Sequence, residues 1–411
     1  MSEIVFQEFE APRVFCLSAC VGRHDGKLLL GCIREKDRRF LFEVYDITGG
    51  AKKWFEVDVT NKRAQALNAF FTVFTPIWGS AALLILLLLI HFEELFLPVV
   101  EHFTFLRGGL ERIFFFIIIL GIPSFIAMIL ASISRSYMRP SIAFQDGMFV
   151  LLYRNGLVKY YDPNGNMMLS KRISVLDSRG VDTICVFVNI VLCILILMAP
   201  IMMISAVIHS KFSFFEMMIF LYIPYLIFCT ILIYLWFPSF FPLIHSRAPK
   251  IHVYHHYVSV VSPEIMDYAK ASIISKGGSI LKSYRIRARR GFLGMFPRYI
   301  MGAIPDRSLM TLVYWDFHNI YVLDMTTGRK RLLARVPEYI VSAHWVRREE
   351  ALLIVTTMGK IYLSNMRGEV TLLRDYGKSI TLSAQINNEI YLAMKSTAQK
   401  YIGSVLCDQP Q

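Results

Sequence analysis

The chain has 411 residues, of which 55% are hydrophobic and 18% charged, and its formal net charge is +13. Soluble domains average roughly 45–50% apolar and about 25% charged residues. The composition therefore excludes intrinsic disorder and a small disulfide scaffold, argues against an ordinary soluble enzyme, and is typical of a membrane protein.

The N-terminal segment, residues 1–68, opens on Glu3, Glu8 and Glu10, so it lacks the basic start of a secretory signal peptide. The chain has seven cysteines. An odd number, partly within apolar stretches, does not indicate a disulfide framework. Cys16 and Cys20 lie four residues apart without a second Cys or His pair, so they are predicted to be buried thiols and not metal ligands.

Four windows of the chain contain no Asp, Glu, Lys or Arg: 69–90, 113–134, 183–208 and 217–243. At about 1.5 Å per residue, each is long enough as a helix to cross a hydrocarbon core of about 30 Å. Such lengths exclude buried core strands. The pattern predicts four transmembrane helices arranged as two hairpins.

Charges flank these windows unequally. The 91–112 loop has two basic and four acidic residues, whereas 135–180 has seven basic and three acidic residues. The tail, residues 244–411, has 23 basic and 12 acidic residues. Because Lys and Arg mark the cytoplasmic side, we expect an integral, multi-pass membrane protein with both termini cytoplasmic, in a bacterial inner membrane or facing a mitochondrial matrix.

The predicted bundle contains no ionisable residue, although ion and proton pathways normally retain some. An anchor or docking surface is therefore favoured over a conduit. Small residues at Gly79, Ala127 and Ala131 are the predicted points of close helix packing.

The remaining segments contain a recurring motif, an alternating strand that runs into a turn ended by glycine. The full copies lie at 42–49, 158–165, 319–328 and 360–368, and 389–394 is a partial copy. Glycine supplies the positive φ that a tight hairpin turn needs. Asp46, Asp162 and Asp324 recur at one motif position, where we expect them to accept backbone N–H groups of the turn.

These repeats resemble the strand-turn-strand edge of β-propeller blades, particularly of the quinoprotein-like superfamily, and the resemblance covers about half of the polar segments. Ile320 and Ile361 are 41 residues apart, the length of one four-stranded blade. The resemblance implies at most six or seven blades. A barrel or sandwich, or several small β units, remain alternatives. Trp54 has no counterpart in the other copies, so no quinone cofactor, nor any other cofactor, is predicted.

The predicted fold class is thus a membrane α plus β protein, with four transmembrane helices inserted in a discontinuous β-rich domain, most plausibly a propeller. The expected segments are β residues 1–68, hairpin 69–134, β residues 135–182, hairpin 183–243 and β residues 244–411. Within the last of these, 244–297 shows no clear blade.

Five basic residues alternate with other residues in one stretch and are predicted to contact lipid headgroups or an acidic partner: Lys282, Arg285, Arg287, Arg289 and Arg290. An ordinary solvated strand fits equally well, and nucleic acid is disfavoured because the stretch offers a single aromatic residue. His252 and His256 are weak metal candidates, expected on one strand face, but no carboxylate or thiol lies at a matching spacing.

No phosphate-binding loop, metalloprotease or nucleophile-elbow motif occurs, so an enzyme is not the predicted function. The first hypothesis is a non-catalytic scaffold subunit of a larger membrane-embedded assembly, with membrane lipids and other protein subunits as partners. A transport or channel component with a regulatory β domain is the second hypothesis. A membrane-bound enzyme with its site in the β domain is the third.

Overall fold

Strands dominate the computed structural model, which describes residues 4–10, 16–48, 50, 52–91, 123, 126–131, 133–177, 179–180, 183, 187, 250–254, 256–263, 268–275, 277–287, 300–346, 350–386, 389–395 and 401–408. These residues form strands β1 to β24 and one long helix, α1. The strands pair antiparallel in six four-stranded sheets, called blades 1 to 6 here.

The first two blades are consecutive in the chain but separated by α1. Blade 1 contains β2 (Ser18–His24), β3 (Lys27–Lys36), β4 (Arg39–Asp46) and β5 (Lys52–Asp58). Helix α1 spans Lys62–His91. Blade 2 contains β6 (Ser141–Gln145), β7 (Met148–Leu152), β8 (Asn155–Tyr161) and β9 (Met167–Asp177).

The next three blades follow the same order, with the innermost strand first. Blade 3 contains β10 (Lys250–Tyr254), β11 (Tyr257–Pro263), β12 (Tyr268–Ile274) and β13 (Ile280–Arg287). Blade 4 contains β14 (Gly302–Pro305), β15 (Thr311–Trp315), β16 (Asn319–Asp324) and β17 (Lys330–Arg335). Blade 5 contains β18 (Ile340–Val346), β19 (Ala351–Thr356), β20 (Lys360–Asn365) and β21 (Val370–Asp375).

Blade 6 joins the two ends of the chain. It contains β22 (Ser379–Ile386), β23 (Glu389–Lys395), β24 (Tyr401–Asp408) and, as its outermost strand, β1 (Ile4–Glu10). Strand β1 pairs with β24 along its whole length, from Ile4 opposite Asp408 to Glu10 opposite Ile402. The ring therefore closes by pairing the first strand of the chain with the last.

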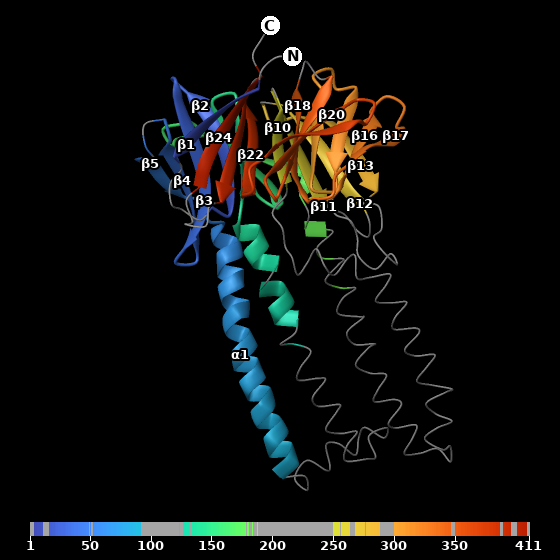
Figure 1. Ribbon diagram of the computed structural model, residues 1–411. Helices are drawn as coiled ribbons and strands as arrows, with labels where there is room; N and C mark the ends of the chain where they lie inside the picture. The colour runs from blue at the N-terminus through green and yellow to red at the C-terminus, as the bar shows by residue number, and fades with distance from the viewer. Residues whose placement is uncertain are drawn as a thin grey trace, which may run out of the picture.

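The six innermost strands form a closed circle. Contacts join β2 to β6, β6 to β10, β10 to β14, β14 to β18, β18 to β22 and β22 back to β2. This arrangement is a β-propeller (Figure 1), which confirms the propeller interpretation of the repeats. The segment 244–297, in which no blade was expected, contains blade 3.

The propeller has two distinct faces. The two chain ends lie on one of them, which we call the terminal face, and α1 leaves from the opposite one, the helix face (Figure 1). Because strands alternate in direction, the second-to-third-strand turns and the connections between blades lie on the helix face. The first-to-second-strand loops lie on the terminal face.

The repeated motif forms the third strand of a blade and the turn that follows it. The Asp324 carboxylate accepts the backbone N–H groups of Thr326 and Thr327 at 2.8 and 3.1 Å. Asp162 accepts those of Asn164 and Asn166 at 2.9 and 2.7 Å. Asp46 accepts the N–H of Thr48 at 3.0 Å, so the predicted turn role of the three aspartates is confirmed.

The glycine that ends the motif has a steric reason in blade 5. Gly368 has a φ of 94°, and a Cβ at this position would lie 2.3 Å from the carbonyl oxygen of Leu333 in blade 4. Any side chain would therefore force blades 4 and 5 apart.

Large side chains fill the space between blades. Trp315 in blade 4 is fully buried, and Phe42 of blade 1 meets Phe149 of blade 2 edge to face with 5.2 Å between ring centroids. Gly302 lies on β14 beside this core. A Cβ added to Gly302 would come within 2.2 Å of Trp315 and 2.5 Å of His252.

Replacing Gly302 by alanine is therefore expected to lower the free energy of unfolding by about 1–3 kcal/mol, the usual cost of overpacking. Gly277→Ala is the matched control, because no atom lies within 4 Å of the added Cβ. Its effect should stay within about 0.5 kcal/mol. Chemical denaturation of the two variants measures both values, and equal stabilities would contradict the packing argument.

Helix α1 is tied to a second helical stretch within residues 126–138. Asn61 caps α1, its Oδ1 accepting the N–H of Ala64 at 3.4 Å. About two turns after this cap, Asn68 Nδ2 donates to the Ala131 carbonyl at 2.7 Å. Arg135 in the second stretch forms a 2.9 Å ion pair with Glu35 of blade 1. The start of α1 is thus held against the helix face.

The prediction of four membrane-spanning helices is wrong for the part of the chain that the structure describes. No helix there is both long and apolar enough to cross a membrane. The 69–90 window lies in α1, whereas 113–134 is described only in part, and 183–208 and 217–243 lie outside the described residues apart from 183 and 187.

The prediction rested on the absence of charged residues alone, and the 69–90 window also contains the helix-weakening residues Pro76 and Gly79. The predicted integral, multi-pass membrane localisation with cytoplasmic termini is contradicted on the same ground.

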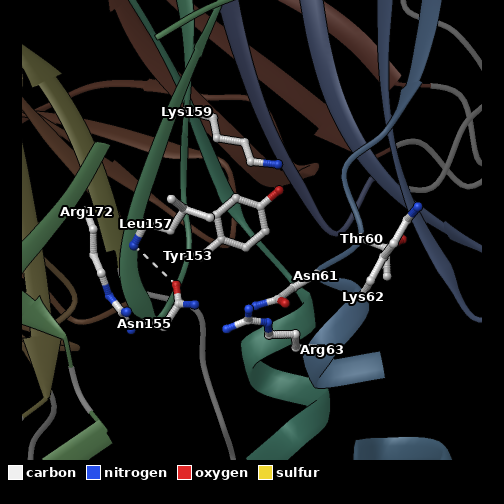
Figure 2. Close-up of a pocket in the computed structure, with 9 residues that line it drawn as sticks. All are labelled: Thr60, Asn61, Lys62, Arg63, Tyr153, Asn155, Leu157, Lys159 and Arg172. Atoms are coloured by element: carbon white, nitrogen blue, oxygen red, sulfur yellow. Dashed lines mark hydrogen bonds between the residues drawn. The ribbon is translucent and has the colours of Figure 1, made fainter. Parts of the chain in front are cut away.

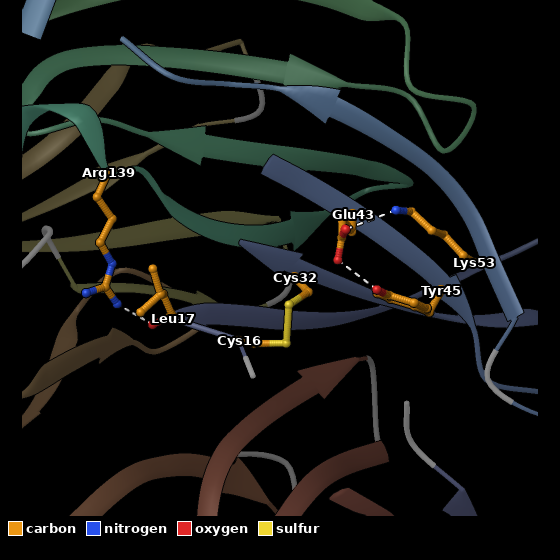
Figure 3. The surroundings of a disulfide bond; sticks show 7 residues. All are labelled: Cys16, Leu17, Cys32, Glu43, Tyr45, Lys53 and Arg139. Carbon is orange, nitrogen blue, oxygen red and sulfur yellow. Dashed lines mark hydrogen bonds and ion pairs between the residues drawn. A yellow bond between two sulfur atoms is a disulfide. The ribbon is translucent and has the colours of Figure 1, made fainter. Parts of the chain in front are cut away.

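A disulfide joins Cys16, just before β2, to Cys32 in β3 (Figure 3). Cys16 was predicted to be a buried thiol and no disulfide was expected, so both predictions are wrong, whereas Cys20 is a buried free thiol as expected. Spacing failed to reveal the pair because the two cysteines meet only across the β2–β3 hairpin, where Ala19 pairs with Cys32. The disulfide fixes the chain where it enters blade 1.

Beside the disulfide, blade 1 contains a buried carboxylate (Figure 3). Glu43 is 2% exposed, and its oxygens accept hydrogen bonds from Tyr45 Oη at 2.7 Å and from Lys53 Nζ at 2.9 Å. Burial opposes ionisation, but these two donors and the Lys53 charge keep the pKa of Glu43 below its usual value. The charge is therefore compensated within the blade.

Candidate functional site

The predicted basic stretch lies on the outermost strand of blade 3. Lys282 Nζ donates a hydrogen bond to the backbone carbonyl of Leu309 at 2.7 Å. The guanidinium carbons of Arg285 and Arg287 lie 4.1 and 5.9 Å from the ring centroid of Tyr268. The other two basic residues lie outside the described residues: Arg289 and Arg290. Contact of this strand with an acidic partner or with lipid stays a prediction.

The two histidines proposed as weak metal candidates do not share a strand face. His252 lies on β10, with its ring centroid 4.9 Å from that of Trp315. His256 lies in the following turn, and its Nδ1 is 2.8 Å from the Asp146 carboxylate. Among the described residues, no group of three or more His, Cys, Asp or Glu side chains could hold a metal ion.

The small residues predicted for helix packing lie on both helical stretches. Gly79 is in the middle of α1, and Ala127 is buried in the second stretch. Ala131 approaches α1 through the carbonyl that accepts from Asn68. Close packing at Gly79 and Ala127 stays a prediction.

Sequence patterns did not indicate a histidine pair on the innermost strands. His344 on β18 is buried, with its Nε2 2.9 Å from Ser342 Oγ and 2.5 Å from Ser383 Oγ. His252 is partly buried and its Nε2 is enclosed. Burial lowers the pKa of His252 to about 4, and the positive charge of Lys250 adds to the shift. Burial likewise lowers the pKa of His344 to about 3, and electrostatic coupling to His252 adds to that shift. Both imidazoles are neutral at pH 7.

An aromatic and methionine cluster with two exposed and two half-buried members, the Tyr339 patch, lies on the helix face of blades 4 and 5. It consists of Phe317, His318, Tyr339 and Met358. The Tyr339 ring centroid is 5.4 Å from that of Phe317 and 4.8 Å from that of His318. Tyr339 and Met358 are 56% and 63% exposed.

Backbone hydrogen bonds hold the patch across the two blades. The Tyr339 carbonyl accepts from the N–H of Thr357, next to Met358, at 2.8 Å. The Phe317 carbonyl accepts from Ile340 at 2.8 Å. Beside it, Lys360 Nζ lies 2.8 Å from Glu338 Oε1. Exposed aromatic and Met side chains on a rigid frame with a charged rim have the composition of a protein-binding surface.

A polar pocket of about 360 Å³ lies where α1 leaves the helix face, between the start of α1 and blade 2 (Figure 2). Nine residues line it: Thr60, Asn61, Lys62, Arg63, Tyr153, Asn155, Leu157, Lys159 and Arg172. Tyr153 is fully buried, with its hydroxyl donating to the carbonyl of Val59. Its ring therefore forms a fixed wall.

Positive charge predominates in this pocket. Arg172 Nη2 lies 3.3 Å from Asp177 Oδ2, and the same carboxylate forms an ion pair with Arg179. Within the described residues, Lys62, Arg63 and Lys159 form no salt bridge, although Asp58 is near enough to act on Lys62 and Lys159. Burial lowers the pKa of Lys159, and the Asp58 charge offsets part of that shift. The lining residues come from 60–63 and 153–172, so no local motif could have revealed them.

Comparisons with known proteins identify no family for this chain. No protein-family profile matches the sequence. No curated protein matches it either. Among solved structures, BamB from Moraxella catarrhalis is similar at 8% identity and a TM-score of 0.33, over 98% of this chain and 84% of BamB. The WD40 β-propeller domain of Doa1 is similar at 8% identity and a TM-score of 0.40, over 95% of this chain and 78% of that chain. The propeller assignment rests on the ring of six sheets.

Proposed function

We propose that this protein is a non-catalytic β-propeller scaffold that binds a partner protein through the Tyr339 patch. The observation that carries the proposal is the exposure of Tyr339 and Met358 on a frame fixed by hydrogen bonds between two blades. Rigid aromatic side chains contribute contact area at a low cost in conformational entropy, and the flexible methionine side chain adapts to the shape of a partner. A partner with an apolar segment flanked by polar groups would match the patch and its Glu338–Lys360 rim.

Photo-crosslinking in the native cell tests this proposal. A benzophenone amino acid at position 339 is expected to yield a discrete adduct with one partner, identified by mass spectrometry. The matched control carries the same amino acid at Met310, which is 58% exposed but lies in a loop on the terminal face. Adding Met358→Glu to the position-339 variant should abolish the adduct, because a charge on the patch would be desolvated on binding.

Two outcomes would contradict the proposal. The same adducts from positions 339 and 310 would show that the patch is not selective. An adduct that persists with Met358→Glu would show that the patch does not make the contact. Because both positions are exposed, thermal unfolding of all variants should stay close to that of the unmodified protein.

A further inference from the structure

We propose that the pocket between the start of α1 and blade 2 is a binding site for a phosphate dianion, either free or as the end group of a small phosphate monoester. The proposal is independent of the Tyr339 patch. It rests on the cavity, on the four basic side chains that line it and on the position of the cavity at the start of a long helix.

The charges of the pocket match a dianion. Lys62, Arg63, Lys159 and Arg172 bring four positive charges. Among the described residues, Asp58 and Asp177 are the carboxylates that act on them, and Asp177 is shared with Arg179, so at least about two positive charges stay uncompensated. Clustered like charges repel one another, so an arrangement of this kind is stabilised when an anion binds among them.

Helix α1 adds a fixed partial charge of the same sign. Its first turn contains Lys62 and Arg63 and no acidic residue, and only part of its N-terminal N–H groups are satisfied by the Asn61 cap. Free N–H groups and the helix dipole favour an anion at this end. The first turn of α1 thus has two cations where helices usually have acidic residues, and it borders an open pocket.

Lys159 is the side chain that we most expect to contact the bound anion. It reaches into the pocket from β8, with its Nζ 5.4 Å from the centroid of the Tyr153 ring (Figure 2). Its surroundings desolvate the ammonium group without placing a carboxylate in salt-bridge contact among the described residues. A bound phosphate would supply that partner and a charge-assisted hydrogen bond.

The size of the pocket sets the class of ligand. About 360 Å³ is at the lower end of the range for small-molecule sites and exceeds the volume of one phosphate group. The Tyr153 ring and the Leu157 side chain offer an apolar wall for a compact organic part, and the Asn155 side chain lies beside them. A sugar phosphate or a nucleoside monophosphate meets these limits.

Calorimetric titration of the purified full-length chain tests the proposal. The probes are inorganic phosphate, glucose 6-phosphate and AMP, with glucose as the uncharged comparison. We expect saturable binding of at least one phosphate probe and none of glucose. Binding of the esters alone would assign the site to monoesters, whereas equal binding of inorganic phosphate would assign it to the free ion.

Two variants test whether the measured phosphate binding takes place in the pocket. Lys159→Gln is expected to weaken binding at least about tenfold, because a hydrogen bond from a charged donor is lost. Lys171→Gln removes the same charge from the neighbouring strand, one residue before Arg172 and outside the pocket lining, and should change affinity less than about twofold. Thermal unfolding confirms that both variants fold.

Three results would overturn the proposal. These are no saturable binding of any phosphate probe, equal affinity in Lys159→Gln and the unmodified chain, and an equal loss of affinity in both variants. The last result would assign the binding to the general positive charge of the protein, which falls steeply with added salt, and not to the pocket.

Discussion

Removal of residues 1–10 is expected to destabilise the whole propeller, lowering the free energy of unfolding by about 3 kcal/mol or more. Strand β1 makes seven residue pairs with β24, and each net backbone hydrogen bond contributes about 0.5–1.5 kcal/mol. Without β1, β24 becomes an open edge and blade 6 keeps three strands. Chemical denaturation monitored by Trp fluorescence measures the loss.

The truncated chain also allows the pairing itself to be tested. A synthetic peptide of residues 1–12, added in excess, should restore stability by adding a strand to β24. The same peptide with Phe6 and Gln7 both replaced by proline is the control. Successive N–H groups of a strand point in opposite directions, so one of the two prolines must remove a donor that faces β24. Equal rescue by both peptides, or undiminished stability of the truncated chain, would contradict closure by β1.

Acidification from pH 7 to pH 5 is expected to lower the free energy of unfolding by roughly 2 kcal/mol for each of His252 and His344. Their pKa values in the folded protein are about 4 and about 3, below the value of about 6.5 for an unfolded chain. Between these limits the unfolded state binds more protons than the folded state. Stability is therefore full above about pH 6.5 and falls as the pH decreases through this window.

A double variant, His252→Gln with His344→Gln, separates this effect from that of the carboxylates. Glu43, Asp177 and Glu338 have lowered pKa values, so their contributions are lost chiefly below about pH 4.5. Urea denaturation at pH 7, 6 and 5 should show a flatter pH dependence in the double variant than in the unmodified chain. Identical slopes would show that the two imidazoles are not the cause.

The repeated motif carried most of the information about the fold. The turn of each copy is built by contacts within a few residues, such as the Asp324 carboxylate with the N–H groups of Thr326 and Thr327. Blade 3 lacks a full copy of the motif, and it was missed because its strands are specified by packing against blades 2 and 4. Absence of charge in 69–90 predicted a spanning helix, whereas no helix among the described residues meets the length and hydropathy that spanning requires.

Neither candidate site could be predicted from the sequence. The Tyr339 patch joins a turn of blade 4, a connection and a turn of blade 5, which backbone hydrogen bonds between blades bring together. The phosphate pocket joins residues 60–63, at the start of α1, to residues of blade 2 between 153 and 172. In both sites, no local sequence pattern distinguishes the residues, because the folded ring alone brings them together.

The sequence of each repeat by itself thus determined that it forms a strand and a hairpin turn, because such a turn needs only its own aspartate, hydroxyl and glycine residues. Only the tertiary structure decided how many blades form, that the first strand completes the last blade, which cysteines pair and which histidines stay neutral. These outcomes depend on contacts between residues up to 404 positions apart, as between Ile4 and Asp408. A single blade cannot bury its two faces alone, so each blade packs against adjacent blades that other parts of the chain form.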